Sequence, residues 1–168
     1  MCGIFAYIGN KKNAAELTLA GLKILEYRGY DSWGIAVKTA DRIAVEKKVG
    51  KIGNAKVTLP KRAIGIGHTR WATHGGVTVA NAHPHLDCTV KIALLHNVII
   101  ENYARIKDEL IAKGHRFISE TDTEVAVHLI EEILKTSNNF PEAVMMAFHR
   151  FTGLYAIVVL SSEKDQVV

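Results

Sequence analysis

Residues 1–9 read Met1-Cys2-Gly3-Ile4-Phe5-Ala6-Tyr7-Ile8-Gly9: a cysteine directly behind the first methionine, then an apolar run closed by glycine. The run from Gly3 to Ile8 is apolar at nearly every position, which predicts a strand buried on both faces. If Met1 is removed, Cys2 carries a thiol and a free α-amine on one carbon, so that the nucleophile brings its own general base. Taken alone, Cys2 is better explained as a small packing residue at the start of that strand.

Composition and charge narrow the class of protein. The 168 residues are 48% hydrophobic and 23% charged, which is typical of one globular domain, expected to span residues 1–168. The net charge of +4 is mild and no run of Lys and Arg alternates with aromatics, so nucleic-acid binding has no support.

No apolar segment approaches the ~20 residues that cross a bilayer, so no membrane segment is expected. Lys11 and Lys12 follow the first apolar run, the reverse of a signal peptide. The only two cysteines, Cys2 and Cys88, make no disulfide framework and favour a cytoplasmic location.

The remaining chain alternates between strand-like and helix-like segments. Further strands are expected at 34–38, 42–49, 63–67, 89–96 and 153–160, of which the first two suggest a hairpin. Helices are expected from Asn13 (a capping box with Glu16) to Gly29, from Asn102 to Gly114, from Asp122 onward and from Pro141 onward. The apolar face of the first of these helices is expected to carry Leu17, Leu22, Ile24 and Leu25. Val167 and Val168 read as the opening of a strand that pairs back, which indicates a piece of a longer protein.

Polar side chains gather in five short segments between these elements. They are YRGYDS (27–32), HTRWATHG (68–75), NAHPH (81–85), HNVIIENY (96–103) and SETDTE (119–124). Loops and strand ends are where sites are usually built. Cleavage of a carboxamide needs a nucleophile, a base and donors for the oxyanion. Binding of a free amino acid also needs a cation, for which arginine is well shaped, and a carboxylate. These segments contain all of those groups.

Each residue also has a simpler explanation. Arg70 could form a surface ion pair, and Asp122 is a good helix N-cap whatever else it does. Asn97 could be a turn residue and Trp71 a core residue. His74, His83, His85 and Cys88 carry zinc-ligand side chains, but their spacing is not a paired ligand motif.

Taken together, Cys-Gly-Ile at the N-terminus and the five segments resemble the class II glutamine amidotransferases, a family of N-terminal-nucleophile hydrolases. HTRWATHG and SETDTE point to the branch that aminates fructose 6-phosphate in amino-sugar biosynthesis. The resemblance implies an α+β fold, a four-layer αββα sandwich (the N-terminal-nucleophile hydrolase fold) with Cys2 at the start of a central strand. It also implies that the C-terminus of this domain is incomplete and that the sugar-isomerase domains are absent.

The resemblance also assigns roles. Cys2 would be the nucleophile after loss of Met1, and the Asn97 side chain with the Val98 backbone N–H would hold the oxyanion. Arg70 would bind the α-carboxylate of L-glutamine and Asp122 its α-ammonium. Three further substrate-site residues are Thr73 and His74, which would assist Arg70, and Trp71, in a loop that closes over glutamine. His83 matches a loop histidine of the substrate site whose role is left open.

No cofactor or metal is implied, and neither nucleic acid nor membrane is a partner. The implied partners are L-glutamine, the sugar-isomerase domains of a full-length enzyme, and a second copy in a homodimer.

Two positions depart from the family pattern. Val98 replaces a glycine, and a β-branched residue there could misplace the oxyanion donor through its methyls or its φ/ψ limits. Trp33 replaces a small residue and needs room beside the core. One alternative is therefore a glutamine-binding module weakened or inactivated by Val98 and the truncation. A less favoured one is a zinc-binding interaction domain that uses His83, His85 and Cys88.

Overall fold

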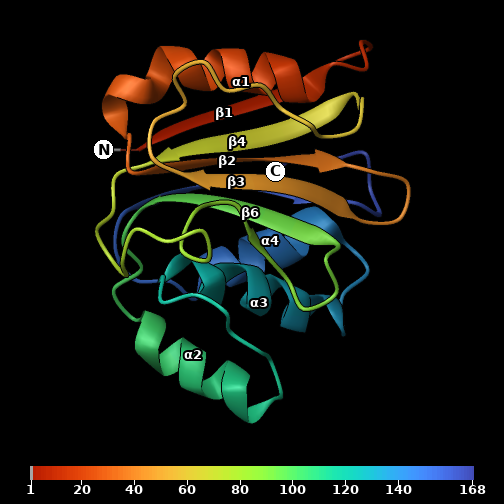
Figure 1. Ribbon diagram of the computed structural model, residues 1–168. Coiled ribbons are helices and arrows are strands. Elements are labelled where there is room, and N and C mark those ends of the chain that lie inside the picture. Colours follow the sequence, from red (N-terminus) through yellow and green to blue (C-terminus); the bar gives the residue numbers. More distant parts are fainter. Residues whose placement is uncertain (1) are drawn as a thin grey trace.

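Two antiparallel sheets lie face to face between helices in the computed structural model, which describes residues 2–168 (Figure 1). The first sheet has the order β1-β4-β2-β3 and the second β5-β6-β7. The strands are β1 (Gly3–Ile8), β2 (Ser32–Lys38), β3 (Ile43–Val49), β4 (Ile64–Arg70), β5 (His85–Leu86), β6 (Ile92–Val98) and β7 (Tyr155–Ser161). The helices are α1 (Ala14–Leu25), the short 3₁₀ turn η1 (Glu26–Arg28), α2 (Tyr103–Ala112), α3 (Thr123–Leu134) and α4 (Phe140–Phe148).

Side-chain alternation along the central strands produces the layers. In β2, Ile35 packs toward α1, whereas the next residue, Ala36, packs toward the second sheet. In β6, Leu94 packs toward α3 and α4, whereas Leu95 packs back toward the first sheet. Because both faces of these strands are buried, they read as nearly continuous apolar runs. The result is the four-layer αββα order expected from the resemblance, with α1 outside one sheet and α3 and α4 outside the other (Figure 1).

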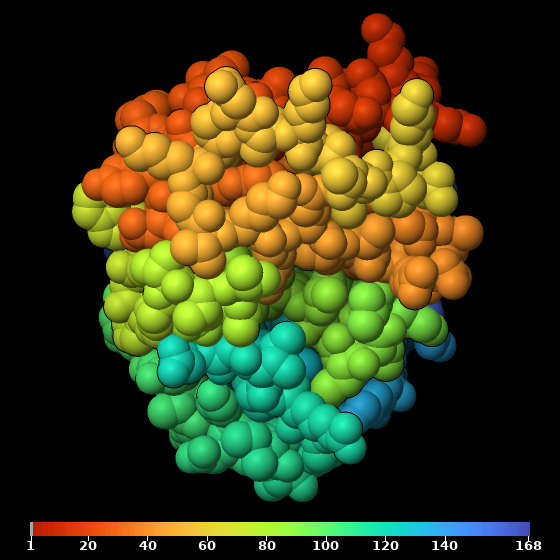
Figure 2. Space-filling model, viewed as in Figure 1, coloured from red at the N-terminus to blue at the C-terminus, as the bar shows by residue number. Residues whose placement is uncertain are grey.

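The two halves of the sandwich come largely from two halves of the chain. Figure 2 shows the red-to-orange segments, α1 to β3, over the upper part of the molecule and the green-to-cyan segments below them. Within the second sheet, β7 comes from the C-terminal end of the chain and pairs with β6. A site between the sheets must therefore combine residues from distant parts of the sequence.

Most expected elements are present, and four expectations about them are wrong. Among the described residues, β1 pairs with β4 alone, so it is an edge strand rather than a central one. It is also not buried on both faces, since Ile8 is 59% exposed. The capping box does not form, since Asn13 makes no side-chain bond at the start of α1. Ile24 was expected on the apolar face of α1 but is 76% exposed, and Leu19 is buried there instead.

The other expected pairings are confirmed. β2 and β3 form the hairpin, and Val168 exchanges two backbone hydrogen bonds with Val159 of β7. Trp33 is buried between α1 and the 50–59 loop, where Ile52 and small side chains such as Ala55 leave it room. No helix among the described residues is both long and apolar enough to cross a membrane.

The register of the strands brings the polar segments to one end of the sandwich. β1 runs antiparallel to β4 with Gly3 opposite Thr69, so Cys2 lies beside the end of β4 at Arg70. β6 ends with Asn97 and Val98 in the second sheet. The start of α3, with Asp122 and Thr123, lies at the same end.

Candidate active site

A cavity of about 580 Å³ opens at this end of the sandwich. All nine residues predicted for the site line it: Cys2, Arg70, Trp71, Thr73, His74, His83, Asn97, Val98 and Asp122. The lining also includes residues that sequence reasoning did not assign: Arg28, His96, Ile99, Thr121, Thr123 and Ala156. Five of these six belong to the polar segments, all but Ala156. Thr121 and Thr123 could equally have been helix-start residues, and Ile99 and Ala156 carry no chemical signal.

The Cys2 thiol is held against the loop that follows β4. Its sulfur accepts a hydrogen bond from the Trp71 backbone N–H at 3.2 Å and lies 3.6 Å from the Trp71 carbonyl. The Cys2–Gly3 peptide is also fixed, since Gly3 N–H donates to Thr69 Oγ1 and Arg28 Nε donates to the Cys2 carbonyl. The thiol therefore has a defined position on the cavity wall. The predicted loss of Met1 concerns residue 1, which lies outside the described residues.

The Asn97 carboxamide lies directly beside the nucleophile. Its Nδ2 donates to the Cys2 carbonyl at 3.2 Å, and its Oδ1 lies 3.0 Å from His68 Nε2. Burial lowers the pKa of His68 to about 3, so this imidazole is neutral. A neutral His68 with its proton on Nε2 donates to Oδ1 and thereby turns the Nδ2 of Asn97 toward Cys2.

Val98 takes the backbone conformation of a glycine. Its φ is +83°, and Val90 is the only other non-glycine residue among 2–168 with a positive φ. A β-branched residue in this region is a genuine outlier, and such strain typically costs about 1–3 kcal/mol. The side chain is 60% exposed and borders the cavity. The backbone at Val98 thus keeps a left-handed geometry, while its methyls add bulk at the cavity wall.

Arg70 is buried, with 3% of its surface exposed, and its guanidinium holds the following loop in place. It donates to the carbonyls of Gly76 at 3.2 Å and Gly75 at 3.4 Å, and to that of His74. No carboxylate lies within ion-pair distance of it in residues 2–168, so the surface ion-pair explanation is wrong. Burial lowers the pKa of Arg70, and the charges of Cys2, Asp31 and Asp122 oppose that shift. A buried guanidinium without a carboxylate partner is unfavourable unless an anion completes it.

Asp122 is buried beside the start of α3 but does not cap the helix. Its side chain makes no cap bond, and Oδ2 instead accepts from Ile100 N–H at 2.8 Å. The N-cap explanation of its residue type is therefore wrong. The nearest imidazole, His96, lies 3.8 Å away, and burial lowers its pKa although the Asp122 charge opposes the shift. A neutral His96 leaves the Asp122 carboxylate without a cationic partner.

The other loop residues form the rim of the cavity. Trp71 is 46% exposed and packs edge-to-face on Tyr30, with the ring centroids 5.4 Å apart. His74 packs edge-to-face on Tyr103, and its Nδ1 is buried without a hydrogen-bond partner. Thr73 completes this rim.

His83 lies deeper, behind His68. Its Nδ1 is 3.1 Å from the His68 ring and its Nε2 is 2.9 Å from Thr123 Oγ1, which in turn lies 3.0 Å from His96 Nδ1. Burial lowers the pKa of His83 as well, so these imidazoles are neutral. Protons on His96 Nδ1, His83 Nδ1 and His68 Nε2 satisfy every bond in this chain, which ends at Asn97.

The side chains of the less favoured zinc alternative do not assemble. His83 packs on His85, with ring centroids 4.8 Å apart, and His85 Nε2 bonds to Thr121. Cys88 contacts neither histidine and lies instead beside His115 and His128. The alternative of a zinc domain built on His83, His85 and Cys88 is therefore not favoured.

Comparison with known proteins agrees with this geometry. Residues 68–168 match the sequence profile of a glutamine amidotransferase domain. The chain is 52% identical over 171 residues to the glutamine–fructose-6-phosphate aminotransferase (isomerizing) of Pyrococcus horikoshii, covering 99% of this chain and 28% of that protein. It is 48% identical over 172 residues to the enzyme of the same name from Thermus thermophilus, covering 100% of this chain and 28% of that protein. The chain thus spans a little over a quarter of these relatives.

Two solved structures have a similar fold. A glutamine phosphoribosylpyrophosphate amidotransferase from B. subtilis, complexed with ADP and GMP, superposes with a TM-score of 0.78 at 26% identity. The match covers 96% of this chain and 35% of that one. A structure described as the allosteric regulatory enzyme of purine biosynthesis superposes with a TM-score of 0.79 at 27% identity, covering 96% of this chain and 36% of that one.

Proposed function

The chain belongs to the glutamine amidotransferase domain family, and we therefore propose that it hydrolyses the side-chain amide of L-glutamine at Cys2. The observation that carries this proposal is a single cavity that combines a thiol, an amide donor, an unpaired buried guanidinium and an unpaired buried carboxylate. That combination matches one substrate class, a free α-amino acid that carries a carboxamide. The whole of 1–168 is proposed to act as one such domain.

Recognition of glutamine rests on the two unpaired charges. Arg70 binds the α-carboxylate, which supplies the anion that its buried guanidinium lacks. Asp122 binds the α-ammonium, since its carboxylate has a backbone donor but no cation. Thr73 and His74 contact the substrate beside Arg70, and Trp71 closes over it. The carboxamide of glutamine then points toward Cys2.

Hydrolysis proceeds in two steps. The Cys2 sulfur attacks the amide carbon, and the Asn97 Nδ2 and Val98 N–H stabilise the negative charge that develops on the oxygen. The tetrahedral intermediate collapses when the C–N bond breaks, the nitrogen gains a proton and ammonia leaves. Water then attacks the thioester, which releases glutamate and restores the thiol. The proposed base is the α-amine that Cys2 gains when Met1 is removed.

His83 is proposed as a positioning residue rather than a substrate ligand. Both of its ring nitrogens are engaged, one with His68 and one with Thr123. Through His68 it fixes the orientation of the Asn97 carboxamide. An oxyanion donor works only when it is held in place before the charge develops.

The wider reaction is proposed from the relatives, of which the chain spans 28%. In a longer protein the ammonia would convert fructose 6-phosphate to glucosamine 6-phosphate on sugar-isomerase domains, in a homodimer. The two free cysteines favour a cytoplasmic location.

An electrophilic glutamine analogue tests the site directly. We expect it to add once to the chain, at Cys2, and to spare Cys88, although Cys88 is the more exposed thiol. Arg70→Gln should abolish this labelling while leaving Cys88 equally reactive toward a general thiol reagent. Labelling of Cys88 in preference to Cys2, or labelling that glutamine does not compete, would contradict the proposal.

A further inference from the structure

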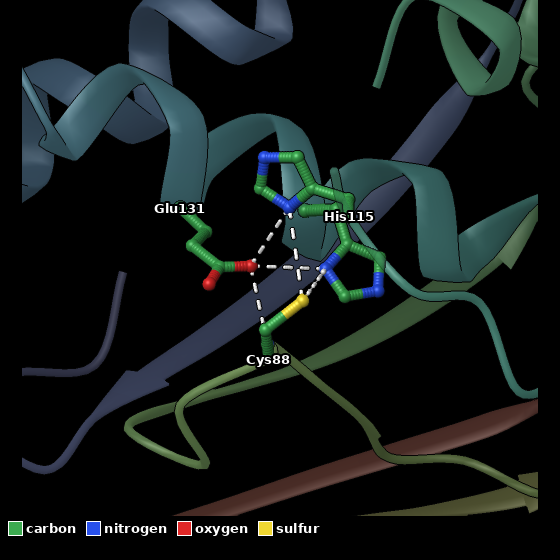
Figure 3. A group of neighbouring side chains, drawn as sticks. Cys88, His115 and Glu131 are labelled. Carbon is green, nitrogen blue, oxygen red and sulfur yellow. Dashed lines mark hydrogen bonds and ion pairs between the residues drawn. The ribbon is translucent and has the colours of Figure 1, made fainter. Parts of the chain in front are cut away.

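A second group of thiol, imidazole and carboxylate side chains lies where the β5–β6 turn, α3 and the segment after α2 meet. Cys88 comes from the turn between β5 and β6, His115 follows α2, and His128 and Glu131 stand three residues apart on α3. Figure 3 shows the side chains of Cys88, His115 and Glu131 converging on one point. The four ligand-type atoms all lie within 4.8 Å of one another, and no other such group exists within 2–168.

The spacing of these atoms matches a tetrahedral metal site. Cys88 Sγ lies 3.8 Å from His115 Nδ1 and 3.6 Å from His128 Nδ1. Glu131 Oε2 lies 3.1 Å and 3.0 Å from the same two nitrogens. Ordinary zinc bond lengths give tetrahedral edges of about 3.6 Å between sulfur and nitrogen and about 3.4 Å between nitrogen and oxygen. These four of the six edges are therefore close to those that one ion would impose, and all six are at most 4.8 Å.

The outer nitrogens of both imidazoles face carboxylates. His115 Nε2 bonds to Glu132 Oε2 at 2.9 Å, and His128 Nε2 lies 3.7 Å from Glu124 Oε1 without a hydrogen bond. Ligating histidines in metal sites usually present their second ring nitrogen to a carboxylate in this way, which fixes the tautomer. Here it directs the lone pair of each Nδ1 toward Cys88.

The charge around the group also favours a cation. Besides Glu131, two further carboxylates, those of Glu132 and Glu124, face the two imidazoles. A metal ion bound between the four ligand atoms would offset this negative charge and would satisfy the Cys88 thiol as well.

We propose that Cys88, His115, His128 and Glu131 bind one Zn²⁺ ion in a structural site separate from the glutamine cavity. The donor set of one sulfur, two imidazole nitrogens and one carboxylate oxygen suits zinc. His115 and His128 are buried whereas Cys88 is exposed, so an ion can enter from the Cys88 side. The bound ion joins the β5–β6 turn, α3 and the segment after α2 that leads to Asp122.

Calorimetric titration of the metal-free chain with ZnCl₂ tests this site. One equivalent is expected to bind, and Co²⁺ in its place should give thiolate-to-cobalt charge transfer and the strong visible bands of a tetrahedral ion. Cys88→Ser and His128→Gln should weaken Zn²⁺ binding at least ~100-fold. Glu132→Gln, which keeps all four ligands and loses an outer partner, should weaken it ~10–100-fold.

Matched variants separate this site from other metal binding. Cys2→Ser removes the other cysteine and His149→Asn removes an exposed histidine, and both should bind Zn²⁺ as the unaltered chain does. The proposal is overturned if the unaltered chain binds no Zn²⁺ or if Cys88→Ser keeps full affinity. A Co²⁺ charge-transfer band that survives in Cys88→Ser and disappears in Cys2→Ser would also overturn it.

Discussion

Val98 stands where the resemblance implies a glycine, and its geometry separates two effects. The positive φ shows that the chain keeps the left-handed backbone, so the N–H direction is retained at the expense of strain. The methyl groups remain on the cavity wall. The sequence raised two concerns about Val98, its φ/ψ limits and the bulk of its methyl groups. Only the bulk beside the substrate persists.

Val98→Gly should therefore raise the kcat of glutamine hydrolysis. The increase should be a few-fold to ~10-fold, below the ~10²–10³-fold effect of losing an oxyanion donor, because the donor itself is retained. Val90→Gly is the matched control, because it removes the other positive-φ valine outside the cavity and should leave kcat unchanged. Unchanged turnover in Val98→Gly would mean that Val98 does not limit catalysis.

Asp122 allows a test of substrate recognition with an isosteric change. Asp122→Asn keeps an oxygen for the Ile100 N–H but loses the charge for the α-ammonium. We expect kcat/KM for glutamine to fall at least roughly 30-fold, equivalent to the ~2 kcal/mol typical of one lost partner in a buried charge pair. Hydrolysis of glutaramate, which is glutamine without its α-amine, should change little. Equal losses for both substrates would rule out this role for Asp122.

At the scale of the elements, the site depends on contacts between the two sheets and α3. β4 supplies His68, β6 supplies Asn97, and the first residue of α3 supplies Thr123. Their hydrogen bonds connect the start of α3 to the oxyanion donor through His83. We infer that this connection, rather than any single loop, sets the geometry of catalysis.

Thr123→Val tests that connection. The substitution has nearly the same shape but leaves His83 Nε2 and His96 Nδ1 without their hydroxyl partner. Stability to unfolding should fall by about 1–3 kcal/mol. The kcat should fall ~10-fold with little change in KM, and Thr123→Ser should restore it. A loss of stability with unchanged kcat would limit Thr123 to a structural role.

At the scale of the whole molecule, one half-buried lysine predicts a pH dependence of stability. Lys47 on β3 donates to the carbonyls of Ala80 and Pro84, and burial lowers its pKa to about 8. Between pH 8 and the unfolded pKa of ~10.4, the unfolded chain binds more protons than the folded chain, so this group makes stability rise with pH.

Lys47→Met should remove that rise. The stability of the unaltered chain relative to Lys47→Met should increase between pH 7.5 and 10.5 by at most ~3 kcal/mol. Denaturant unfolding across this range measures it, and Lys56→Met, at an exposed lysine, should not reproduce it. A constant difference across this pH range would contradict the assignment.

The sequence predicted the site better than it predicted the packing around it. All nine predicted site residues line one cavity because each belongs to a short motif that is recognisable locally. The burial of β1 and the capping by Asn13 were wrong because strand order and helix docking override local patterns. The partners of Cys88 lie 27 and 40 residues away, on separate elements, so no spacing rule could identify them.

The most direct test of the central claim is glutamate release from L-glutamine by the unaltered chain and by Cys2→Ala, with the intact mass of each measured on the same sample. We predict that the unaltered chain lacks Met1 and releases glutamate and ammonia in equal amounts, and that Cys2→Ala releases neither. Equal release by both chains, release by a chain that retains Met1, or no release by either would contradict the account.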